Sequence, residues 1–74
     1  MTFDGECKGY RLHYETYSTQ EIYCTVEQNG RTVATAKLSS VGNAWSLRYL
    51  RNELPDGDAR EIRAFLMRHT PDRL

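Results

Sequence analysis

The sequence lacks a long apolar run, and it has few cysteines, few prolines and no excess of charge of either sign. Its 74 residues include two Cys and two Pro, and 10 Lys and Arg residues balance 10 Asp and Glu residues. A chain without a long apolar run has no transmembrane helix, and its polar start lacks the basic and apolar regions of a signal peptide. We therefore expect a cytoplasmic protein that does not associate with membranes, and we expect no disulfide framework.

The balanced charge and the short length also limit the classes of function. General binders of polyanions usually carry a basic excess, which this chain lacks. We expect residues 1–74 to form one small domain, which leaves no room for a cofactor domain beside a substrate domain. One core of this size supplies only about 3–5 kcal/mol. A homodimer, which adds buried area, is therefore worth considering.

Catalytic and cofactor motifs are missing as well. The sequence has no glycine-rich phosphate loop and no C-x-x-C pair. The chain's only thiols and imidazoles belong to Cys7, His13, Cys24 and His69. Their spacing matches no zinc pattern, and the strand pattern described next places Cys24 and His13 on opposite faces of the sheet. We therefore predict no catalytic residue, no cofactor and no metal site.

The clearest positive signal is an alternation of apolar and polar residues. Residues 10–17 alternate in this way, as a half-buried β-strand does. Residues 21–27 and 32–38 repeat the pattern on either side of Asn29-Gly30, a dipeptide typical of hairpin turns. Residues 1–8 show no period, so we expect them to be loose.

The hairpin allows two registers, and they differ in where they place the charges. A two-residue loop would put Lys37 on the buried side of the sheet. A three-residue loop over 28–30 places Lys37 opposite Glu21 and Glu27 opposite Arg31 on the exposed side. Opposite-charge pairs across strands contribute about 0.2–1 kcal/mol each. The sequence therefore favours the three-residue loop.

Residues 44–50 can be read in two ways. Trp45, Leu47 and Tyr49 alternate as in a strand, whereas Leu47, Leu50 and Leu54 have helical spacing. Trp and Tyr at alternate positions are typical of strands. We therefore interpret this segment as a fourth strand and leave the helical alternative open.

The last element is predicted to be an amphipathic helix over residues 58–69. Asp58 fits an N-cap and Glu61 completes a capping box. The apolar stripe of this helix consists of Ala59, Ile62, Phe65, Leu66 and His69. The predicted fold is α+β: a four-stranded antiparallel β-meander over 9–51 with one C-terminal helix packed on one face (β-β-β-β-α). One helix cannot cover four strands completely, and an antiparallel sheet tolerates one face in contact with water. We therefore expect an open sheet face.

Two surfaces are candidates for binding. Tyr and Arg are enriched at protein–protein hot spots. On the open sheet face they give the candidate residues Arg11, His13, Tyr17 and Tyr23. The outer side of the helix gives a second set, Arg60, Arg63 and Arg68.

These observations predict a non-enzymatic protein-binding module or inhibitor that occupies a partner's surface. Small motif-free α+β proteins of neutral charge include phage-borne inhibitors such as anti-CRISPR proteins, an analogy of size and class. The alternative is a single-stranded nucleic-acid-binding module whose Tyr and Arg side chains stack on bases. Glu15 and Glu21 on the same face would repel phosphate, so another protein is the favoured partner. A homodimer would cover the open face or a sheet edge.

Overall fold

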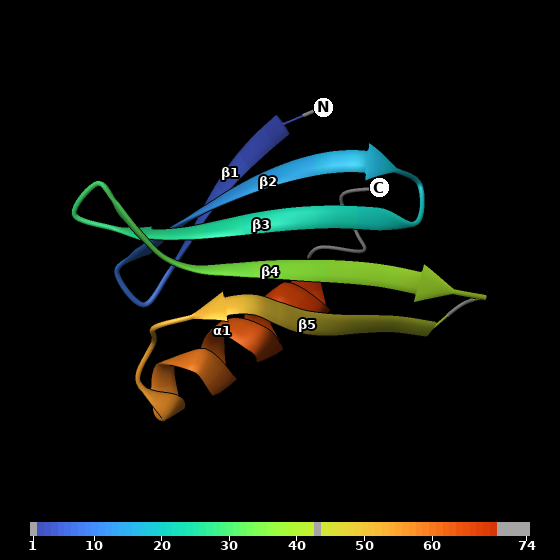
Figure 1. Ribbon diagram of the computed structural model, residues 1–74. Helices are drawn as coiled ribbons and strands as arrows, with labels where there is room; N and C mark the ends of the chain where they lie inside the picture. The colour runs from blue at the N-terminus through green and yellow to red at the C-terminus, as the bar shows by residue number, and fades with distance from the viewer. Residues whose placement is uncertain (1, 43, 70–74) are drawn as a thin grey trace.

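The computed structural model describes residues 2–42 and 44–69, which form five strands followed by one helix. These elements are β1 (Thr2–Cys7), β2 (Tyr10–Ser18), β3 (Glu21–Gln28), β4 (Arg31–Val41), β5 (Ala44–Asn52) and α1 (Asp56–His69). The strands form one antiparallel sheet in the order β1-β2-β3-β4-β5, and α1 lies on one face of it (Figure 1). The α+β class, the antiparallel meander and the C-terminal helix are confirmed, as is the strand assignment of residues 44–50. The predicted number of four strands is wrong.

The additional strand is β1, in the segment 1–8 that we expected to be loose. β1 pairs with β2 along its whole length, and Lys8 and Gly9 form the turn with φ of 57° and 83°. Positive φ at both positions is what a two-residue hairpin turn of the primed type requires. Gly5 takes a core-side position in β1, where a Cβ would lie 3.4 Å from the ring of Tyr14. Because a glycine stands where an apolar side chain would mark the buried face, the sequence alternation is not visible.

The β3–β4 hairpin combines features of the two registers weighed from the sequence. Asn29 and Gly30 alone form the turn, with φ of 56° and 77°, and Gln28 pairs with Arg31. The predicted three-residue loop is therefore wrong, and so are the direct cross-strand pairings of Glu27 with Arg31 and of Glu21 with Lys37.

A β-bulge then restores the predicted faces. Glu27 pairs with Thr32 but Val26 pairs with Ala34, which leaves Val33 as an extra residue in β4. The extra residue shifts the register by one. Lys37 consequently lies opposite Tyr23 and stays out of the core, although a two-residue turn without a bulge would have buried it.

The hydrophobic core lies between α1 and one face of the sheet. The helix contributes Ala59, Ile62 and Leu66, and the last two side chains are fully buried. The sheet and the loop before α1 contribute Tyr10, Leu12, Tyr14, Ile22, Cys24, Val26, Ala34, Ala36, Leu38, Leu47 and Leu54. Burial of a Leu or Ile side chain contributes about 1.5–3 kcal/mol. The core is thus built from alternate strand positions and one helical stripe, as the periodicities predict.

The N-terminus of α1 differs from the prediction. The helix begins at Asp56, and the N–H of Ala59 donates to the Pro55 carbonyl at 2.9 Å, so Asp58 is not the N-cap. The Asp58 carboxylate instead accepts hydrogen bonds from the Tyr10 hydroxyl at 2.6 Å and from Lys8 Nζ at 2.8 Å. This carboxylate therefore ties the β1–β2 turn to the first turn of the helix.

Shortening one core side chain tests the packing of α1. We expect Ile62→Val to lower the free energy of unfolding by about 0.5–1.5 kcal/mol, because it removes a methylene group from a fully buried side chain. Urea unfolding followed by circular dichroism measures the change. Ala64→Ser, at an exposed position of the same helix, is the control. Equal losses in the two variants would contradict the core assignment of Ile62.

Removing the Asp58 carboxylate tests the link between the turn and the helix. The hydrogen bonds from Lys8 and then Tyr10 hold the pKa of Asp58 below its usual 3.8. A lowered pKa contributes stability above the unfolded-state pKa, and this contribution is lost as the pH falls through the native pKa.

We therefore expect Asp58→Asn to be less stable than the wild type near neutral pH. The difference should shrink as the pH falls from about 5 to below the lowered native pKa. Urea unfolding at a series of pH values measures it. Asp56→Asn, in the same helical turn, is the control. A difference that stays constant with pH would contradict the link.

Candidate functional site

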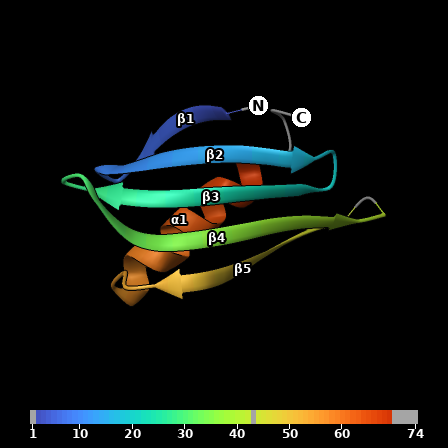
Figure 2. The same ribbon diagram turned by 45° about the horizontal axis from the view of Figure 1, so that its top comes forward.

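The face of the sheet that α1 does not cover is the candidate functional site, and we call it the open face. Figure 2 looks onto it, with α1 behind the strands. Strand residues directly opposite each other share a face, so the pairing identifies its members. They include Asp4, Glu6, Arg11, His13, Glu15, Glu21, Tyr23, Thr25, Glu27, Thr32, Thr35, Lys37, Ser39, Ser46, Arg48 and Arg51. Each of these side chains is exposed or half-buried.

Two tyrosines and a lysine occupy the middle of the open face. Tyr23 is on β3, the central strand, and the Tyr17 ring meets it edge-on with ring centroids 4.8 Å apart. Tyr17 lies where the β2–β3 register shifts, and it is 64% exposed. A bulge of this kind re-aims a side chain. Lys37 Nζ lies 5.8 Å from the centroid of the Tyr23 ring, on the side of β4.

Charges divide the open face into two halves. The acidic half, on β1 to β3, contains Asp4, Glu6, Glu15, Glu21 and Glu27, which outnumber Arg11 and His13 there. The basic half, on β4 and β5, contains Lys37, Arg48 and Arg51. Strands in a meander follow their order along the chain, so a charge difference along the sequence becomes a charge difference across the surface.

One pair in the basic half brings like charges together. Lys37 and Arg48 are direct cross-strand partners, an arrangement that destabilises a sheet. Lys37 has a carboxylate nearby, that of Glu21 at 3.5 Å. Arg48 makes no ion pair with any residue in the described ranges. The basic half therefore carries positive charge that the chain's own described residues do not fully neutralise.

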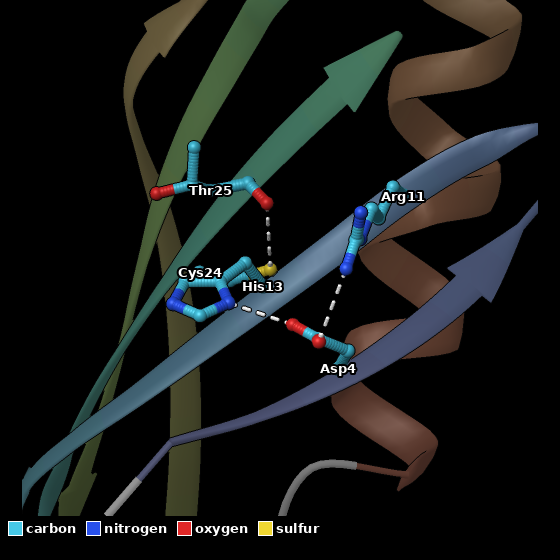
Figure 3. Close-up of polar contacts among 5 residues, drawn as sticks. All are labelled: Asp4, Arg11, His13, Cys24 and Thr25. Carbon is cyan, nitrogen blue, oxygen red and sulfur yellow. Dashed lines mark hydrogen bonds and ion pairs between the residues drawn. The ribbon is translucent and has the colours of Figure 1, made fainter. Parts of the chain in front are cut away.

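Asp4 is the centre of a cluster at the β1 edge of the open face. Its carboxylate contacts His13 Nδ1 at 2.6 Å and Arg11 Nη2 at 3.4 Å (Figure 3). The hydrogen bond with His13, helped by Arg11, lowers the pKa of the Asp4 carboxyl. The cluster neutralises part of the acidic half, and its members Asp4 and Arg11 line a shallow hollow together with Gly5, Glu6 and Gly9.

The thiols of the chain do not join this cluster. Cys24 lies on the core side of the sheet, where its Sγ donates to the Thr25 carbonyl oxygen at 3.9 Å (Figure 3). Burial raises the pKa of Cys24 to about 12, so its nucleophilic thiolate does not form near neutral pH. Cys7 and Cys24 are both free, and burial raises the pKa of Cys7 too.

The described part of the chain offers neither a metal-ligand cluster nor a helix that could cross a membrane. Within residues 2–42 and 44–69, no three His, Cys, Asp or Glu side chains are grouped so that they could hold a metal ion. No helix in the same ranges combines the length and the apolar content that crossing a membrane requires.

The candidate residues predicted from the sequence lie on two separate surfaces. Arg11, His13 and Tyr23 share the open face, and Tyr17 reaches it through its contact with the Tyr23 ring. The second set lies on α1, on the opposite side of the sheet, and consists of the exposed residues Arg60, Arg63 and Arg68.

Sequence reasoning missed Asp4 and Glu6 because it missed β1. Lys8-Gly9 was the signal that could have revealed this strand, since it precedes a clear strand just as Asn29-Gly30 does. Sequence reasoning also left Arg48 out of the site, because the register between β4 and β5 was not predicted. The open face thus gathers two tyrosines between an acidic and a basic half.

Comparison of the chain with protein-family models, with curated proteins and with solved structures gives no match.

Proposed function

We propose that the chain is a non-enzymatic protein-binding module whose interface is the open face. The observation that carries this proposal is the Tyr17–Tyr23 pair at the centre of an uncovered sheet face, with charged side chains on both sides. Tyr and Arg dominate protein–protein hot spots, which lie near the middle of an interface. Such a module acts by occupying the surface of its partner, as small protein inhibitors do.

The position of Tyr23 suits it to be an anchor. It stands on the central strand, so a partner seated on the open face would surround its ring and exclude water from it. A tyrosine ring brings a large rigid contact area and loses little conformational entropy. The charges around it would orient the partner and speed its approach.

The open face is a better candidate than the outer side of α1. The helix presents Arg60, Arg63 and Arg68, but Phe65 and Met67 are half-buried against the core. An Arg-rich helix surface without an exposed aromatic residue is what a solvated helix normally shows. The open face combines the exposed ring of Tyr17 and the half-buried ring of Tyr23 with charge, so we assign the interface to it.

Capture of partners from an extract of the source cell tests this assignment. We expect the tagged wild-type chain to retain specific proteins that Tyr23→Thr loses, because the substitution removes the ring but keeps a residue that favours strands. Quantitative mass spectrometry compares the retained proteins. Circular dichroism checks that the variant is folded.

The matched control changes the other surface. The double variant Arg60→Ala/Arg68→Ala should retain the same proteins as the wild type. Retention by Tyr23→Thr with loss in the helix variant would move the interface to α1. Retention by both variants would reject the open face as the binding site.

A second candidate function uses the same tyrosines. Tyr17 and Tyr23 could stack on bases while Lys37 and Arg48 neutralise phosphates, as in binders of single-stranded nucleic acids. Glu15 is the cross-strand partner of Tyr23, and Glu21 lies two residues before Tyr23 on β3. The carboxylates of both residues repel phosphate. Protein binding is therefore the preferred function.

A salt titration separates the two functions. Fluorescence anisotropy measures the affinity for labelled single-stranded oligonucleotides over a range of salt concentrations. A nucleic-acid-binding module gives an affinity that falls steeply with salt. We expect weak binding with no difference between wild type and Tyr23→Thr. Tight, salt-dependent binding that Tyr23→Thr abolishes would favour the nucleic-acid function instead.

A further inference from the structure

We propose that the partner of the open face is a second copy of this chain, bound face to face about a two-fold axis that runs along β3. This inference rests on the proposed function, because it identifies the protein that the same face binds. It starts from the division of the open face into an acidic half on β1 to β3 and a basic half on β4 and β5.

The direction of the axis decides which charges meet. A two-fold axis parallel to the strands sets β4 of one copy over β2 of the other, and β5 over β1, while β3 faces β3. The basic residues of β4 and β5 then face the acidic strands β1 and β2, whereas Glu21 and Glu27 on β3 face their own counterparts. An axis in the plane of the sheet but perpendicular to the strands would set basic half on basic half. The observed charges therefore select the first arrangement.

The row of side chains through Tyr23 is complementary to itself. Glu15, Tyr23 and Lys37 are successive cross-strand partners, so the acid and the base stand one strand away from Tyr23 on either side. Under the two-fold axis, Tyr23 meets the partner's Tyr23, and Lys37 meets the partner's Glu15 on both sides of it. Two sheets packed face to face cross at about 30°, and a rotation moves the residues nearest the axis least.

A second row adds to this complementarity. Asp4, His13, Thr25 and Thr35 lead across the sheet to Arg51, so Arg51 would stand over the partner's Asp4. Each of these two ends already has a contact within its own chain, Asp4 with His13 and Arg51 with Glu53. This second row adds to the fit, and the row through Tyr23 contributes most because it crosses the axis, where a rotation of the sheets displaces residues least.

The charged residues of the row through Tyr23, Lys37 and Glu15, are only partly neutralised within the monomer. Lys37 stands beside Arg48, and a partner carboxylate would relieve the repulsion between these two cations. Glu15 is exposed, and its one hydrogen bond within the described part of the chain comes from the Tyr17 hydroxyl at 3.3 Å. Lys37 already has the Glu21 carboxylate at 3.5 Å within its own chain, and a second copy adds the Glu15 carboxylate to it on both sides of the axis.

The size of the face is compatible with a dimer. The two longer extents of the molecule, 34 and 23 Å, set an upper limit of roughly 800 Å² on the area of the face, and each partner buries about this much in a standard protein–protein interface. The interface is polar and of standard size, so we expect a reversible dimer at micromolar concentrations.

Sedimentation equilibrium of the full chain with charge-reversed variants tests the proposal. The wild type should sediment as a dimer of the 8.6 kDa chain. Lys37→Glu should set two carboxylates against each other, and Glu15→Lys should set two ammonium groups against each other. Each should weaken the dimer at least about tenfold. An equimolar mixture of the two variants should dimerise again, because both contacts then join opposite charges.

The control for charge is Arg68→Glu, which changes the net charge as Lys37→Glu does but lies on α1. It should dimerise like the wild type, and circular dichroism verifies that all variants fold. A wild type that stays at 8.6 kDa overturns the proposal, as do reversed variants that dimerise normally or a mixture that does not recover.

The two experiments distinguish a failure of the dimer proposal from a failure of the proposed protein-binding function. If the chain is monomeric but Tyr23→Thr still loses captured proteins, the open face binds a different protein and only the dimer is rejected. If the chain is monomeric and captures nothing, both proposals fall. If it is a dimer that the charge reversals weaken, the open face is a protein interface and its partner is a second copy.

Discussion

The packing of one helix against one face of the sheet is the constraint on which the other features depend. α1 buries Ile62 and Leu66 against the strands, so each strand must turn its apolar positions towards the helix. Because side chains alternate along a strand, the same packing forces the remaining positions to the other face. The polar character of the open face is therefore a consequence of the core. Its pattern of charges and tyrosines is not, since any polar residues would satisfy the core equally well.

The meander converts an asymmetry of the sequence into an asymmetry of the surface. Acidic residues prevail in the first three strands and basic residues in the last two, and consecutive strands are neighbours in space. A sheet with crossover connections would have mixed the two signs. The net charge of zero therefore conceals a separation of the two signs across the open face.

The faces of the strands could be predicted from the sequence, but the pairing of residues could not. Alternation identified Ile22 as inward, and the pairing of opposite charges favoured an outward Lys37; both placements are correct. The register failed because the bulge at Val33 adds one residue, so the length of the turn no longer determines which residues are opposite. No local sequence signal marks that bulge.

Two further differences arise from tertiary contacts. β1 was missed because Gly5 fills a core position over which the ring of Tyr14 lies, and a glycine does not mark a buried face. The start of α1 was misplaced because the carboxylate of Asp58 bonds Lys8 and Tyr10, which are distant in the sequence. A capping pattern describes local bonds only. Only part of the candidate site could be predicted, again because local patterns do not describe tertiary contacts. Tyr23 and Arg11 follow from alternation, whereas Asp4 lies on β1, a strand that the alternation does not reveal.

The composition of the open face determines what kind of association it supports. Its large rings are those of Tyr23 and the adjoining Tyr17, and the other members are charged or small and polar, apart from His13. Such a face offers little apolar area, so binding must draw on the tyrosines for contact and on charge complementarity for orientation. Exposed charges are screened over about 10 Å at 0.1 M salt. A partner held in this way dissociates readily, and the fold of the monomer, whose core lies entirely on the other side of the sheet, does not depend on it.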